Sequence, residues 1–99
     1  MVSKYKLFWT EEALRNLDEI LIYLETNWTD RERKTFIIKL SKQIDLIHRN
    51  PNLFPVSEYN SRLRKAVLSK QTTIFYELDG FNINLIYLFN SKKDIKRIK

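Results

Sequence analysis

Residues 72–89 read TTIFYELDGFNINLIYLF, and this stretch decides the fold class. Thr72 to Leu78 is rich in β-branched and aromatic residues, a composition that is typical of strands. Asp79-Gly80 is a strong signal for a two-residue hairpin turn, and Asn82 to Phe89 then alternates as a second strand. The stretch therefore predicts an antiparallel hairpin. One face of the returning strand is predicted to carry Ile83, Leu85, Tyr87 and Phe89, and the other Asn82, Asn84, Ile86 and Leu88.

Two helical patterns precede this hairpin in the sequence. Thr10 is a good N-cap for an amphipathic helix that is predicted to end near Thr26-Asn27. Thr29 and Glu32 fit a capping box at the start of a second helix, and Pro51 ends that helix. Because only a short gap separates the two patterns, we predict that the helices pair as an antiparallel helical hairpin.

Two shorter strands complete the predicted order of elements. Lys4 to Trp9 reads as a first strand, and Leu63 to Leu68 alternates as a strand before the hairpin. The sequence therefore predicts an α+β fold in one domain over residues 1–99. This fold has an N-terminal strand, an antiparallel helical hairpin and a three-stranded antiparallel meander, with the helices on one sheet face. Residues 50–61 form a predicted loop, held to the core by Leu53, Phe54 and Val56.

Composition predicts a folded cytoplasmic protein. Residues of the apolar set make up 43% of the chain, which is too much for a disordered protein. The chain contains no cysteine, which favours an intracellular location. No apolar run approaches the roughly 20 residues needed to cross a bilayer, and residues 1–6 lack an apolar stretch of signal-peptide length. We therefore expect no membrane partner.

The net charge of +6 is unevenly distributed. Residues 1–60 hold nine basic and nine acidic residues, whereas residues 61–99 hold nine basic and three acidic residues. The whole excess therefore lies in the last 39 residues of the chain. A basic face made by this part predicts a polyanionic partner, either nucleic acid or an acidic protein segment. A solubilising surface is the alternative interpretation of the same excess.

The order of elements and several local patterns resemble the RelE/ParE toxin superfamily. The resemblance covers nearly the whole chain and rests on five segments: residues 8–13 (FWTEEA), 50–55 (NPNLFP), 63–67 (LRKAV), 74–76 (IFY) and 86–94 (IYLFNSKKD). It implies a sheet with a helical hairpin and a concave basic face formed largely by the later strands. It also implies a toxin of a plasmid-stabilisation type module, which a cognate antitoxin that is small and acidic or partly disordered holds inactive. Some members are ribosome-dependent mRNA endonucleases, and others bind DNA gyrase.

The sequence departs from the nuclease members at the positions where they place catalytic groups. Those members often carry an arginine in the strand before the tyrosine, where this chain has Thr72 or Thr73. Asn90 stands where a histidine is frequent, and an asparagine cannot exchange a proton near neutral pH. Lys92 replaces an arginine and cannot form a bidentate fork. These departures favour action through a protein target such as gyrase over a metal-independent mRNA endonuclease.

The candidate residues for substrate or partner binding share a position in or after the closing strands. They are Arg62, Arg64, Lys65, Lys70, Tyr76, Tyr87, Asn90, Lys92 and Lys93. If the protein is an enzyme, Arg64, Lys70 and Lys92 are the candidates for holding the phosphate, and Arg64 is the best single candidate because an arginine clamps a phosphate or a carboxylate. The tyrosines are more often core or sheet-face aromatics. Each basic residue has an ordinary solvated side chain as its alternative.

Other chemistries find little support in the sequence. His48 is the only histidine and lies near the end of the second predicted helix, where a capping or surface role is favoured. With no cysteine, one histidine and no acidic residues at ligand spacing, we expect neither a metal nor a cofactor. Three functions stay open: a gyrase-binding toxin, an mRNA endonuclease acting on the ribosome, and a basic binding module without toxicity.

Overall fold

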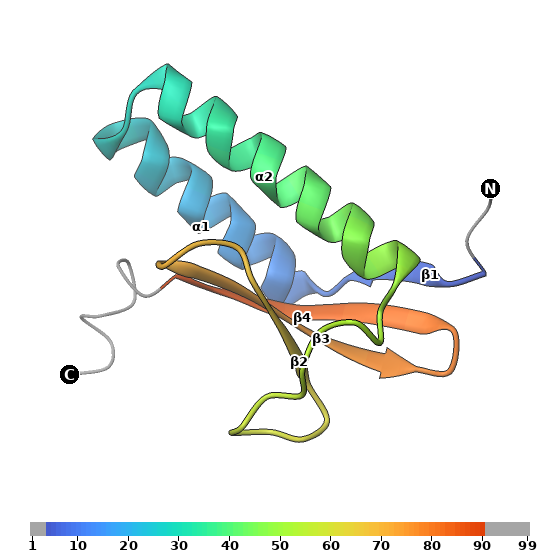
Figure 1. Ribbon diagram of the computed structural model, residues 1–99. Helices are drawn as coiled ribbons and strands as arrows, with labels where there is room; N and C mark the ends of the chain where they lie inside the picture. Colours follow the sequence, from blue (N-terminus) through green and yellow to red (C-terminus); the bar gives the residue numbers. More distant parts are fainter. Residues whose placement is uncertain (1–3, 91–99) are drawn as a thin grey trace.

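The computed structural model describes residues 4–90, and its element order confirms the predicted β-α-α-β-β-β fold (Figure 1). The four strands form one sheet in the order β1-β4-β3-β2. Strand β4 runs antiparallel to β3 but parallel to β1, an orientation that the local sequence patterns did not predict. The elements are β1 (Lys6–Trp9), α1 (Glu11–Asn27), α2 (Asp30–Arg49), β2 (Arg64–Val67), β3 (Thr72–Asp79) and β4 (Asn82–Asn90).

Both helices begin at the predicted caps. The Thr10 hydroxyl accepts a hydrogen bond from the Ala13 backbone N–H at 3.1 Å, and the same oxygen lies 2.8 Å from the carbonyl oxygen of Leu85 in β4. This threonine therefore caps α1 and joins it to the sheet. Thr29 and Glu32 form the predicted capping box at the start of α2. Within residues 4–90, neither helix is long and apolar enough to span a membrane.

The core lies between the helical hairpin and one face of the sheet (Figure 1). Apolar residues of both helices meet apolar residues of β2, β3 and β4, and this burial supplies the main driving force for folding. The helices contribute Ala13, Ile20, Leu24, Phe36, Leu40 and Ile47, and the sheet contributes Ala66, Ile74, Tyr76, Ile83, Leu85 and Leu88.

The hairpin turn lies one residue later than the sequence predicted. Asp79 still pairs with Asn82, so the two turn residues are Gly80 and Phe81 rather than Asp79 and Gly80. Gly80 has a φ of +62°, a conformation that costs glycine little and that hairpin turns require at the first central position. The hairpin prediction is confirmed, and its assignment of the turn residues is wrong by one.

A β-bulge in β4 overturns the predicted alternation beyond Leu85. Phe75 pairs with Tyr87 whereas Tyr76 pairs with Leu85, so Ile86 is an extra residue in the ladder. Because the extra residue changes the phase of the strand, Tyr87 no longer shares a face with Leu85. The buried residues of β4 are Ile83, Leu85, Leu88 and Asn90.

Candidate functional site

The sheet face opposite the helices, called here the open face, changes character along the strands. The pairing register places its residues in four rows across the sheet. Near the start of β3 the two rows are mostly aromatic or apolar, with Thr73 and Lys65 as their polar members, and the Phe75 and Tyr87 rings stack at 4.7 Å between centroids. Toward the hairpin the rows become polar and charged. The rows are Val67, Thr73, Phe89; Lys65, Phe75, Tyr87; Glu77, Asn84, Phe8; and Asp79, Asn82, Lys6.

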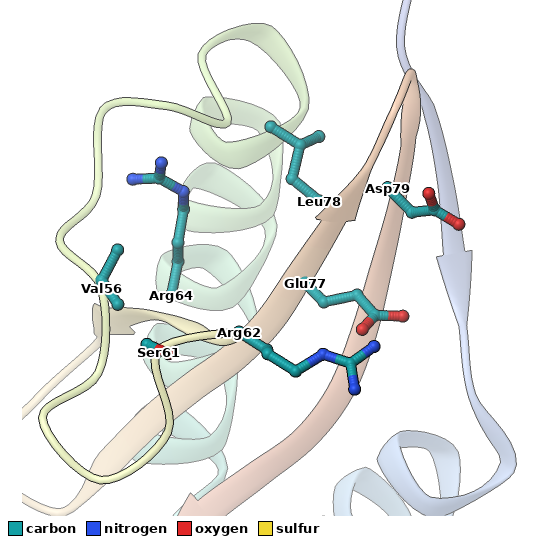
Figure 2. A pocket seen from close by; sticks show the side chains of 7 residues that line it. All are labelled: Val56, Ser61, Arg62, Arg64, Glu77, Leu78 and Asp79. Atoms are coloured by element: carbon teal, nitrogen blue, oxygen red, sulfur yellow. The ribbon is translucent and has the colours of Figure 1, made fainter.

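A cleft lies where β3 runs past the start of β2 (Figure 2). It has a volume of about 420 Å³, within the range of small-ligand sites. We call it the edge cleft. Two arginines and two acidic residues line it, so its formal charge is balanced rather than basic. Its lining residues are Val56, Ser61, Arg62, Arg64, Glu77, Leu78 and Asp79.

The two arginines of the edge cleft point in different directions (Figure 2). Arg64 pairs with Tyr76 across the β2–β3 ladder, and its Nη1 donates a hydrogen bond of 2.6 Å to the Phe54 carbonyl. This bond holds the guanidinium against the loop on the helix side of the sheet. Arg62 extends toward Glu77 on the other side of the cleft. The candidate Arg64 is therefore both a loop anchor and a cleft residue.

Tyr76 lies inside the protein. Its side chain is fully buried, and its hydroxyl donates a hydrogen bond of 2.6 Å to the Pro51 carbonyl. Burial raises the pKa of Tyr76 to about 12, and the nearby Arg64 charge opposes this only partly. The ring also meets Phe54 edge-on, with centroids 6.4 Å apart. Tyr76 thus fixes the loop after α2 and is not accessible to a substrate.

The loop is anchored differently from the sequence prediction. Phe54 is partly buried and packs against the core as expected. Leu53 and Val56 are 63% and 43% exposed, so the prediction that they hold the loop to the core is wrong for both. The missing anchors are polar. Hydrogen bonds from the Tyr76 and Arg64 side chains to loop carbonyls hold the loop in place. Sequence spacing cannot predict such bonds, because their partners are distant in the chain.

Asn90 and His48 are both held in structural contacts. Asn90 is buried at the end of β4, and its Nδ2 lies 3.3 Å from the Thr72 Oγ1 on the paired strand. The His48 Nε2 lies 2.7 Å from the Tyr5 carbonyl oxygen, beside β1 and at the opposite edge of the sheet from β2. The only histidine therefore tethers α2 to the first strand and is remote from the edge cleft.

The other candidates do not gather in one place. The Lys65 ammonium lies 3.5 Å from a Glu58 carboxylate oxygen, on the open face beside Phe75. Lys70 is exposed in the turn between β2 and β3. Tyr87 stacks on Phe75 on the open face. Lys92 and Lys93 lie outside the described residues. Of the seven candidates that the structure describes, only Arg62 and Arg64 line the edge cleft.

The sequence analysis missed the acidic half of the edge cleft. Glu77 and Asp79 line the cleft, and the Asn84 Nδ2 donates a hydrogen bond of 3.2 Å to the Glu77 carboxylate. A signal was present, because both acidic residues lie at alternate positions on the strand face opposite the buried Ile74 and Tyr76. Within residues 4–90, no group of three or more potential metal ligands comes together.

Comparisons with known proteins give a family match and several structural matches. Residues 7–98 match the family described as the ParE toxin of the type II toxin-antitoxin system, parDE. No protein with a curated description matches the sequence. The fold is similar to that of the chromosomal ParDE system from P. aeruginosa, with a TM-score of 0.74 and 17% identity over 88% of this chain and 96% of that chain.

Two further solved structures share the fold. The E. coli DinJ-YafQ complex matches with a TM-score of 0.62 and 10% identity, over 90% of this chain and 96% of that chain. The YoeB-YefM complex from Staphylococcus aureus matches with a TM-score of 0.57 and 14% identity, over 86% of this chain and 94% of that chain. At such low identities these likenesses establish the fold and leave the chemistry to the residues themselves.

Proposed function

Since the chain belongs to the ParE toxin family of type II toxin-antitoxin systems, we propose that it arrests growth by binding DNA gyrase and not by cutting mRNA. The support comes from the residues of the sheet and of the edge cleft. Metal-free RNA cleavage needs a base for the 2′-hydroxyl, cations for the phosphorane and an acid for the leaving 5′-oxygen. The proposal depends on which of these three groups the described residues can supply.

Among the described residues, the edge cleft has no group suited to act as the general acid. The candidate Tyr76 precedes the cleft residue Glu77 in β3, but it is fully buried and its hydroxyl donates a hydrogen bond to the Pro51 carbonyl. A pKa near 12 also makes proton release from Tyr76 unfavourable at neutral pH. The only histidine bonds to the Tyr5 carbonyl near the other edge of the sheet. The burial of Tyr76 is the observation that carries the proposal.

The mRNA endonuclease is kept as a second candidate because of the acidic residues in the edge cleft. Glu77 could act as the base, and Arg62 and Arg64 could stabilise a charged phosphate. This mechanism would still require an acid from outside the described residues. Codon-linked mRNA breaks that disappear in a Glu77→Gln variant with intact folding would support the endonuclease.

We also propose a cognate antitoxin as partner. The ParDE, DinJ-YafQ and YoeB-YefM structures are named as toxin-antitoxin systems or as complexes of two proteins. The net charge of +6 suits a small partner that is acidic or partly disordered and that folds on binding. Co-expression with the small reading frame next to its gene should restore growth. Continued arrest at equal toxin levels would exclude that reading frame as the antitoxin.

The target can be identified in two experiments. In the first, the chain is induced in a bacterial host, and transcripts and DNA damage are followed together. We expect growth arrest with filamentation and DNA-damage signalling, and no codon-linked breaks in primer extension. In the second, the purified chain is added to gyrase, and supercoiling is measured. Codon-linked breaks with unaffected supercoiling would overturn the gyrase proposal and support the endonuclease.

A further inference from the structure

Strand β3 extends beyond its neighbour and leaves part of its edge without a partner strand. The β2–β3 ladder begins with the pair Arg64 and Tyr76, whereas β3 continues to Asp79. Over its last three residues, β3 therefore has β4 on one side and the edge cleft on the other. An uncovered strand edge is a template for pairing with another extended chain.

The backbone of Leu78 faces this gap. The Lys65 N–H donates to the Pro55 carbonyl, so the backbone groups of Lys65 point away from β3 and those of Arg64 point toward it. Tyr76, the partner of Arg64, therefore directs its N–H and C=O toward β2. Because alternate residues of a strand direct these groups to the same side, Leu78 directs its N–H and C=O into the edge cleft. Leu78 has no backbone hydrogen bond on this side within residues 4–90.

The outer edge of β2 provides a contrast within the same sheet. There the segment around Val56 forms a bridge with Arg64, and the Ser57 N–H donates to the Leu63 carbonyl at 2.7 Å. The loop after α2 thus closes the edge of β2 but leaves the end of β3 open. The bridge at Val56 is therefore an example of an extended segment that pairs along the β2 edge of the sheet.

Charges are arranged on both sides of the open edge (Figure 2). On the helix side, Arg64 lies on the same face as Leu78, since both alternate with outward residues. On the opposite side, Glu77 and Asp79 outnumber the one cation, Arg62. The ion pairs found among the described residues include neither Arg62 nor Arg64. The cleft therefore offers an unpaired cation above the edge and a net negative charge below it.

We propose that the edge cleft binds an extended segment of a protein partner, which adds to β3 as a short strand opposite Leu78. The partner residue opposite Leu78 exchanges two backbone hydrogen bonds with it and shares its face, so an acidic side chain there meets Arg64. The residues before and after it face Glu77 and Asp79, and basic side chains fit there. The recognised pattern is basic, acidic, basic. This inference does not depend on gyrase being the target.

The test uses the full chain labelled with 15N and two capped pentapeptides with threonine at both ends. One has the central order lysine, glutamate, lysine, and the other has glutamate, lysine, glutamate. We expect the first peptide to shift the Leu78 amide resonance and to slow its hydrogen exchange. The Glu77 amide faces β4 and serves as the internal control, because its exchange should stay slow with and without peptide.

Variants separate the backbone contribution from the charges. Replacing Arg64 with methionine should weaken the first peptide about tenfold, as expected for loss of a charged hydrogen bond. Asp79→Asn should weaken it about threefold, since an exposed ion pair contributes less. Lys42→Gln removes an exposed cation of α2, outside the cleft, and should leave binding unchanged. Arg64→Met could also disturb the loop, because it removes the hydrogen bond to the Phe54 carbonyl. In that case Asp79→Asn still tests the charge pattern.

Three results would overturn the proposal. Equal binding of both peptides would exclude the charge pattern, and shifts elsewhere with an unaffected Leu78 amide would exclude the strand edge. Binding of a short oligouridine to the cleft, with no response to either peptide, would make it a nucleic-acid site instead. None of these outcomes tests gyrase inhibition, so the two proposals can fail separately.

Discussion

Tyr76 and Tyr87 lie on adjacent strands of the same sheet, yet they face opposite sides of it. Tyr76 is on the helix-covered face, where its hydroxyl is fully buried and bonded to Pro51. Tyr87 is on the open face, where it stacks on Phe75 and stays partly exposed. The same residue type therefore builds the core on one face and remains available to a partner on the other. The bulge at Ile86 decides this, because it sets the face of every later residue in β4.

The largest expected effect comes from truncating the two tyrosines in turn. Tyr76→Ala should lower the free energy of unfolding by about 3–5 kcal/mol, because it leaves a large cavity and removes the bond to the loop. Tyr87→Ala should cost only about 1 kcal/mol, mainly for the lost ring contact. Urea denaturation of both variants measures the difference. Equal costs would mean that the two faces of the sheet are not distinct in packing.

The next effect is the pH dependence that Tyr76 confers. Its pKa is about 12 in the folded chain, against an ordinary value near 10 when unfolded. Between these values the unfolded chain loses the proton while the folded chain keeps it, so stability must fall as the pH rises from 10 to 12. The slope from this one group is about 1.4 kcal/mol per pH unit. Tyr76→Phe should remove this part of the slope in urea titrations, and an unchanged slope would contradict it.

Two threonine variants extend the comparison of the two sheet faces, with smaller expected changes in the free energy of unfolding. Thr10→Ala should lower the free energy of unfolding by about 1–2 kcal/mol, since it removes the cap of α1 and the contact with the Leu85 carbonyl. Thr73→Ala, on the open face, should change it by less than about 0.5 kcal/mol. Thermal unfolding followed by circular dichroism compares the two. A larger loss for Thr73 would indicate that something covers the open face.

In the edge cleft the expected effect on stability is small, and the effect on function should be largest. Arg64→Ala should lower the free energy of unfolding by about 1 kcal/mol, the contribution of its bond to Phe54. It should also reduce growth arrest after induction. Lys42→Ala removes an exposed cation of α2 and should leave both unchanged. Full arrest by Arg64→Ala at equal expression would remove this residue from the functional surface.

Much of the fold could be predicted because local patterns specify it. The caps at Thr10 and Thr29, the helix end before Pro51 and the hairpin near Gly80 each depend on a few neighbouring residues. The candidate site was harder to predict. Arg64 was predicted as a site residue and does line the edge cleft. Glu77 and Asp79 line the same cleft only because β3 extends beyond the start of β2. Asn90 and Tyr76 were among the binding candidates, and their burial depends on pairing with distant strands.

By itself, the sequence determined the element order, the helix boundaries and the family resemblance. These follow from propensities, caps and periods of 3.6 and 2 residues, which act over short distances along the chain. Only the tertiary structure decided which face Tyr76, Tyr87 and Asn90 occupy, where the sheet edge is open, and which charges share the cleft. One extra residue in a ladder changes the face of all those after it, and such a bulge is defined by two strands together.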